Sequence, residues 1–196
     1  EDIKNAGIEN VMALRGDLTP ELEKSGLADC DYHHAAELVY ELAESGAGFC
    51  IGGACYPEIH PESANQKEDI KYLKEKVEAG CEFLTTQMFF DNNLLYNFLY
   101  KIREAGITVP VIPGVMPITN ANQVERAVKL SGSFVPQRFK SLVDKFGANP
   151  AAMKQAGIAY ATESRKYLKL LVFVCRRMLV ITPVRQRLKP IMWQRR

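Results

Sequence analysis

Four helix-like stretches of this sequence each end in a glycine, and this repeated pattern is the strongest constraint on the fold. The glycines are Gly46, Gly80, Gly106 and Gly132. Each follows a stretch in which apolar residues recur at the spacing of one helix face. A glycine directly after a helix takes up the left-handed cap conformation without the steric cost of a Cβ atom. We therefore expect four helices that end at these glycines, and two further helices over residues 136–146 and 150–163.

Short apolar runs alternate with these helices. The runs cover residues 10–14, 48–55, 82–87 and 109–114. They are apolar on both faces rather than on alternate residues, which is typical of buried parallel strands. Strand and helix therefore alternate with a period of roughly 25–35 residues, as in βα units.

Four βα units fit either an open doubly wound sheet or part of a closed (β/α)8 barrel. Both architectures carry function at the carboxyl ends of their strands, and every expected strand here ends in polar or conformationally special residues. No Gly-x-Gly-x-x-Gly motif follows any strand, which argues against a dinucleotide site of the Rossmann type. A complete barrel takes about 250 residues, whereas this chain has 196. We therefore predict an α/β fold that is an incomplete TIM barrel.

The net charge of +2 conceals an uneven distribution along the chain. Residues 1–163 contain 15 Lys and Arg against 23 Asp and Glu, whereas residues 164–196 contain ten basic residues and no acidic one. We therefore expect a partial barrel domain over residues 1–163 and an atypical basic tail, foreign to that fold, over residues 164–196.

The cysteines and the apolar runs indicate a cellular setting. The chain has five cysteines and no Cys-x-x-Cys pair, which argues against a zinc site or a disulfide framework. We expect reduced, mostly buried thiols, no bound metal and a cytoplasmic location. No signal peptide is recognisable, and the apolar run over residues 170–174 is far shorter than the roughly 20 residues that span a membrane. We expect no membrane partner.

The first two strand ends carry motifs suited to a flat or phosphorylated ligand. In Leu14-Arg15-Gly16-Asp17 the arginine can pair with phosphate and the glycine permits close backbone approach, although a solvated turn is the more ordinary interpretation. In Tyr56-Pro57-Glu58-Ile59-His60-Pro61 two prolines stiffen a loop that presents two rings. Such a loop suits an adenine or flavin ring.

The next two strand ends complete the series. Thr85-Thr86-Gln87-Met88-Phe89-Phe90-Asp91 places a glutamine whose carboxamide both donates and accepts, which matches the edge of a pterin. Its two phenylalanines are more often core residues than ligand contacts. Val111-Ile112-Pro113-Gly114-Val115-Met116-Pro117 forms a stiff, apolar end of the fourth strand.

In this order and at these spacings, the four motifs resemble the methylenetetrahydrofolate reductase family, over roughly residues 7–163. The resemblance implies a TIM-barrel flavoprotein that binds FAD. Such an enzyme reduces 5,10-methylenetetrahydrofolate to 5-methyltetrahydrofolate with NADH or NADPH, in one-carbon metabolism and methionine biosynthesis. It further implies a small-molecule folate partner, no nucleic acid, and a homo-oligomer in the full-length family.

The resemblance also assigns roles to individual residues. Asp17 and Gln87 are the implied catalytic residues. The implied FAD contacts are Arg15, Gly16, Asp17, Ala35, Tyr56, His60, Asp69 and Lys76. The implied folate contacts are Asp17, Gln87 and Gln123.

Two alternatives to a reductase remain open. The family's barrel begins with three further βα units that carry a glutamate acting as general acid, and the resemblance places these units before Glu1. The first alternative is therefore a non-catalytic barrel fragment without the general acid. The second is a nucleic-acid-binding protein that uses the ten basic residues of 164–196 as its electrostatic contact.

Overall fold

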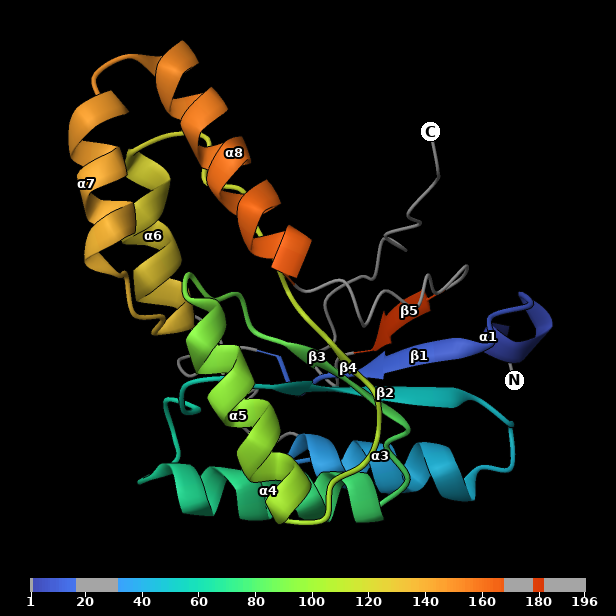
Figure 1. The fold of residues 1–196 in the computed structure, drawn as a ribbon. Helices are drawn as coiled ribbons and strands as arrows, with labels where there is room; N and C mark the ends of the chain where they lie inside the picture. Colours follow the sequence, from blue (N-terminus) through green and yellow to red (C-terminus); the bar gives the residue numbers. More distant parts are fainter. Residues whose placement is uncertain (1, 17–31, 168–177, 182–196) are drawn as a thin grey trace, which may run out of the picture. The chain divides into compact units, whose positions relative to one another are not determined.

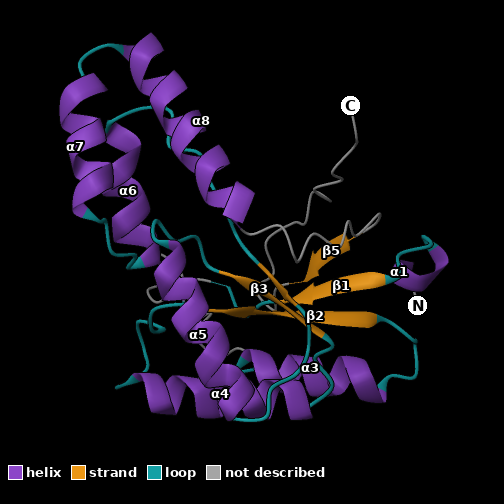
Figure 2. Ribbon diagram, in the orientation of Figure 1, coloured by secondary structure: helices purple, strands orange, loops and turns teal. Residues whose placement is uncertain are grey.

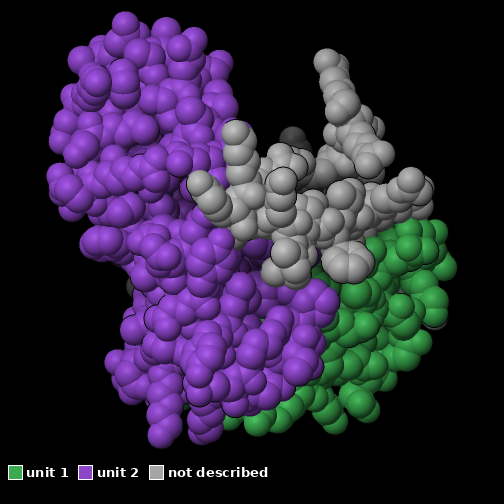
Figure 3. All heavy atoms as spheres, viewed as in Figure 1, with its two compact units in different colours: residues 1–54, 72–84, 173–196 green, residues 55–71, 85–172 purple. Residues whose placement is uncertain are grey.

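The computed structural model describes residues 2–16, 32–167 and 178–181. The chain divides into two compact units (Figure 3). Unit 1 contains residues 1–54, 72–84 and 173–196, and unit 2 contains residues 55–71 and 85–172. Asp17, Cys30 and Cys175 lie outside the described residues, so the predictions made for them are not addressed by the structure.

Helices and strands alternate along the chain as the sequence predicts (Figures 1 and 2). The strands are β1 (Asn10–Ala13), β2 (Cys50–Cys55), β3 (Phe83–Thr86), β4 (Val111–Ile112) and β5 (Met178–Ile181). The helices are α1 (Asp2–Asn5), α3 (Ala35–Glu44), α4 (Gln66–Glu78), α5 (Asn92–Glu104), α6 (Asn122–Ser131), α7 (Gln137–Phe146) and α8 (Pro150–Tyr167).

The strands of unit 1 form a parallel sheet around β1. In this unit the strand order is β3-β2-β1-β5, and β1 pairs in parallel with both of its neighbours. Val11 and Ala13 have no exposed surface and Met12 is only 4% exposed, so β1 is buried on both faces. This confirms the prediction of buried parallel strands. One of these two neighbours, β5, lies within the 164–196 segment.

The glycine pattern correctly predicted where four helices end. The φ angles of Gly46, Gly80, Gly106 and Gly132 are 64°, 118°, 84° and 67°, all in the region that favours glycine. The sequence was less informative at β4, which we expected over residues 109–114 and which spans only Val111–Ile112. Pro110 and Pro113 flank this strand, and a proline cannot donate a backbone hydrogen bond to a strand ladder.

In unit 2, α6, α7 and α8 form a helical group around one apolar core (Figure 2). The buried core residues are Phe90, Ile118, Ala127, Val135, Phe139 and Met153. The ring of Phe139 lies 4.8 Å from the ring of Phe90 and 4.8 Å from that of Tyr160, measured between centroids. Because Phe90 follows β3, this core braces the segment that leaves the end of that strand.

The cysteines of the described segments form no disulfide and are present as thiols, namely Cys50, Cys55 and Cys81. Burial raises the pKa of the Cys81 thiol to about 11, and the nearby Lys76 ammonium only partly opposes this. At pH 8 only about 0.1% of such a thiol is the reactive thiolate. We expect iodoacetamide at pH 8 to label Cys50 well before Cys81 in the folded protein, and both at similar rates in denaturant. Peptide mass spectrometry over time checks this, and equally fast labelling of both thiols in the folded state would contradict it.

Candidate functional site

In unit 1, two of the predicted cofactor contacts directly follow β1. Gly16 has a φ of 85°, so the chain turns here through a conformation that a residue with a Cβ adopts only at a cost. The preceding Arg15 is partly buried. The structure therefore places a cation beside a glycine turn at the carboxyl end of the strand, as the motif predicts.

Lys76 brings a second cation to a strand end of unit 1. It projects from α4, and its Nζ donates to the carbonyl oxygen of Ala54, near the end of β2, at 2.8 Å. A Cβ on Gly53 would lie 2.8 Å from Lys76 Cδ, so the glycine leaves room for the lysine stem. Ala35 is the first residue of α3. The ring of the preceding residue, His34, stacks on the ring of Tyr72, with 6.5 Å between the ring centroids.

In unit 2, the loop after β2 presents a fixed pair of rings. Tyr56 and His60 meet edge to face, with ring centroids 4.5 Å apart and an angle of 85° between the planes. Asp69, on α4, accepts the backbone N–H of His60 at 3.3 Å and the hydroxyl of Ser63 at 3.2 Å. Three of the predicted cofactor residues are therefore brought together, with the aspartate fastening the loop that holds both rings.

Glu58 lies in the same loop, and the sequence analysis gave it no role. Its two carboxylate oxygens lie 3.0 and 2.9 Å from the backbone nitrogen of Phe134, which donates to them. Its own carbonyl oxygen accepts the side-chain amide of Gln66 at 3.3 Å. Burial raises the pKa of Glu58, and the hydrogen bond from Phe134 opposes part of that effect. The only sequence signal for this carboxylate was its place between two prolines.

Gln87 stands at the end of β3 in a defined orientation. Its backbone N–H donates to the carbonyl of Cys55 at 2.8 Å, and its side-chain oxygen accepts the N–H of Met88 at 2.8 Å. Since that N–H needs an acceptor, the carboxamide oxygen is assigned to this side and the NH2 group points elsewhere.

The end of β4 lies against the end of β3 in unit 2. Thr86 Oγ1 accepts the N–H of Gly114 at 2.8 Å, and a Cβ on Gly114 would overlap the carbonyl of Thr86. The glycine of the fourth motif, Gly114, is therefore required by this close backbone approach.

Gln123 has a local contact in the structure. It lies in the first turn of α6 and is exposed, and its side-chain oxygen accepts the N–H of Thr119 at 2.9 Å. This bond fixes the turn that leads into the helix. Its predicted contact with folate stays a prediction.

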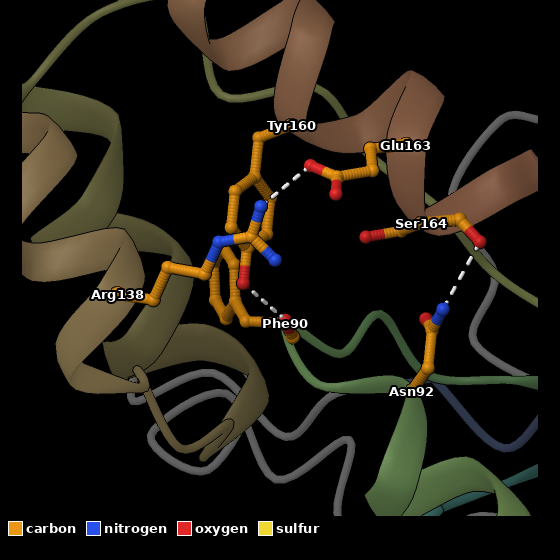
Figure 4. Close-up of polar contacts among 6 residues, drawn as sticks. All are labelled: Phe90, Asn92, Arg138, Tyr160, Glu163 and Ser164. Atoms are coloured by element: carbon orange, nitrogen blue, oxygen red, sulfur yellow. Dashed lines mark hydrogen bonds and ion pairs between the residues drawn. The ribbon is translucent and has the colours of Figure 1, made fainter.

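Side chains that the sequence analysis missed hold the segment after Gln87 (Figure 4). The Tyr160 hydroxyl donates to the Phe90 carbonyl at 2.6 Å, while Arg138 lies 5.7 Å above the Tyr160 ring and pairs with Glu163 at 2.7 Å. Asn92 donates to the carbonyl of Ser164 at 3.1 Å. Within the described ranges, no cluster of His, Cys, Asp and Glu could hold a metal ion, and no helix is long and apolar enough to cross a membrane.

A sequence model described as methylenetetrahydrofolate reductase matches residues 1–175. The chain belongs to this family. It is 36% identical over 160 residues to methylenetetrahydrofolate reductase 2 of Saccharomyces cerevisiae, covering 80% of this chain and 27% of the yeast protein. It is 34% identical over 167 residues to 5,10-methylenetetrahydrofolate reductase of Escherichia coli, covering 85% of this chain and 54% of that enzyme.

Other relatives carry the electron donor in their names. Methylenetetrahydrofolate reductase (NADH) 1 of Zea mays is 35% identical over 176 residues, covering 85% of this chain and 30% of the maize protein. The chain thus spans about a quarter to just over half of the length of these relatives. The family resemblance drawn from the four motifs is confirmed.

Proposed function

We propose that the protein carrying this sequence reduces 5,10-methylenetetrahydrofolate to 5-methyltetrahydrofolate, with NADH or NADPH as electron donor and FAD as bound cofactor. The observation that carries the proposal is the bond from Gln87 N–H to the carbonyl of Cys55, the residue before Tyr56. It sets the proposed folate residue beside the loop proposed to hold the flavin nucleotide.

The residues present are chemically suited to FAD. The nucleotide would lie against the Tyr56 and His60 rings, because flat aromatic ligands stack on side chains held at a fixed angle. Arg15 would offer its guanidinium fork to a phosphate of FAD beside Gly16. Asp17, Ala35 and Lys76 are further proposed contacts with FAD. Bound by these residues, FAD would supply the chemistry of hydride transfer between the nicotinamide and the folate.

In this proposal Gln87 orients the substrate. Its side-chain oxygen is held by the N–H of Met88, so the carboxamide presents its two N–H groups to acceptor atoms along the edge of the pterin. Gln123 is a proposed second folate contact, and Asp17 a proposed carboxylate beside the flavin and the folate. Orientation of the two reactants, rather than proton transfer, is the contribution that we assign to Gln87.

The proposal extends to the setting of the reaction. We propose that residues 1–163 belong to an incomplete TIM barrel. We also propose that the tail over residues 164–196 is not native to that barrel, although its strand β5 pairs with β1. We further propose a cytoplasmic, homo-oligomeric enzyme of one-carbon metabolism and methionine biosynthesis.

The purified protein should show the visible absorption of a bound flavin and should oxidise NADH or NADPH only when the folate is present. We expect Gln87→Ala to lower the folate-dependent rate about tenfold or more while the flavin content stays unchanged, since it removes the proposed hydrogen bonds to the substrate and leaves the proposed flavin contacts in place. Gln155→Ala, at an exposed position of α8, is the matched control. A colourless protein that is inactive with folate would contradict the proposal and favour the non-catalytic alternative, and salt-sensitive DNA binding would favour the nucleic-acid alternative.

A further inference from the structure

The turn between α6 and α7 contains two buried serines. Ser131 and Ser133 are 7% and 4% exposed. A buried hydroxyl lowers stability unless it finds a hydrogen-bond partner. Ser131 Oγ donates to the carbonyl of Ala127 at 2.7 Å and accepts the N–H of Ser133 at 3.2 Å. These bonds fix the 131–135 turn internally.

The same turn contacts both segments of the proposed site that lie in unit 2. Ser133 Oγ donates to the carbonyl of Met88 at 2.8 Å, directly after Gln87. The next residue, Phe134, donates its backbone N–H to the carboxylate of Glu58, between Tyr56 and His60. Two successive residues of one turn therefore contact the two segments. Ser133 holds the residue that follows Gln87, and Phe134 holds the proposed flavin loop.

We propose that the 131–135 turn is the element that sets the spacing between the flavin loop and Gln87, with Ser133 and Glu58 as positioning residues. This inference rests on the proposed function, because it assigns a purpose to contacts between the segments that the proposal uses.

The Ser133 contact acts on Gln87 through the backbone of a single residue, Met88. The N–H of Met88 holds the side-chain oxygen of Gln87, and the carbonyl of Met88 is held by Ser133. A shift of Met88 therefore turns the carboxamide of Gln87. Because a displacement of about 1 Å at a reacting group can cost a hundredfold in rate, one hydroxyl remote from the substrate can matter.

The Glu58 contact acts on the ring pair through the loop backbone. A carboxylate accepting from an N–H forms a charge-assisted hydrogen bond, and both oxygens of Glu58 lie within reach of the same nitrogen. Gln66 holds the carbonyl of Glu58 from α4. The loop is therefore fixed from two directions, and the Glu58 carboxylate ties it to the 131–135 turn.

The test compares Glu58→Ala, Glu58→Gln and Ser133→Ala with the exposed controls Glu41→Ala and Ser141→Ala. Three quantities are measured: hydrogen exchange of the Phe134 amide, the Kd for FAD and the Kd for 5-methyltetrahydrofolate. We expect Glu58→Ala to lose protection of the amide and to weaken FAD binding about tenfold. Glu58→Gln restores both, since the carboxamide oxygen still accepts. Ser133→Ala weakens folate binding about tenfold and leaves the Kd for FAD within about twofold of wild type.

The outcomes separate this inference from the function on which it rests. A Phe134 amide that stays protected in Glu58→Ala overturns the inference whether or not the protein binds FAD. A Ser133→Ala protein that is less stable but has unchanged Kd values for FAD and 5-methyltetrahydrofolate also overturns the inference, because Ser133 then has only a structural role. A wild-type protein that binds neither ligand overturns the proposed function and this inference together.

Discussion

Replacing Gly157 with alanine is expected to destabilise the protein by about 3 kcal/mol, although the same change in most helices is stabilising. Gly157 lies in α8, where alanine normally improves on glycine by about 1 kcal/mol. A Cβ at this position would lie 2.8 Å from the carbonyl carbon of Ile118 and would overlap its oxygen. The added Cβ would meet the backbone of the buried residue Ile118 rather than the flexible end of a side chain. The cost of overpacking therefore outweighs the gain in helix propensity.

Thermal or chemical denaturation measures this effect. The sign of the change in the free energy of unfolding shows whether the clash with Ile118 or the higher helix propensity of alanine is the larger contribution. Gly46→Ala is the control, because nothing lies within 4 Å of a Cβ there while its φ of +64° disfavours alanine. We expect that control to cost only about 1 kcal/mol. A Gly157→Ala protein as stable as wild type, or more so, would show that α8 does not pack against Ile118 as the structure has it.

The local elements were predictable because their signals lie within a few residues of one another. The left-handed glycines end their helices where the sequence places them, and the run from Asn10 to Ala13 is buried on both faces. The end of α8 was predicted less well. This helix continues to Tyr167, beyond the expected end at residue 163, and residues 164–167 contain no glycine or proline that would stop it.

The candidate site was predictable only where a motif carried it. The spacing of Tyr56 and His60 within one proline-flanked loop predicts that their rings cooperate, and the structure joins them. The contact from Phe134 to Glu58 spans 76 residues, and that from Ser133 to Met88 spans 45. Such contacts depend on how α6 and α7 return to the strand ends, which a single sequence does not encode in any local pattern.

Replacing Phe139 with alanine is expected to lower the free energy of unfolding by about 3–5 kcal/mol. Phe139 is 1% exposed and packs against Phe90 and Tyr160, so the truncation leaves a cavity between these two remaining rings. Tyr160 in turn donates to the carbonyl of Phe90 (Figure 4). The cavity therefore loosens the segment after β3 as well as the helical group.

Phe134→Ala is the matched stability control, since that ring is 56% exposed and its removal should cost less than about 1 kcal/mol. Phe139→Leu should recover part of the loss, because it refills some of the cavity. Denaturant unfolding of the three variants gives the ranking, and hydrogen exchange over residues 87–92 reports on the segment beside Gln87. Equal losses for Phe139→Ala and Phe134→Ala would contradict a core centred on Phe139. Exchange that rises over residues 87–92 in Phe139→Ala alone would tie the position of Gln87 to the packing of this core, because Phe90, which contacts the ring of Phe139, lies in that segment.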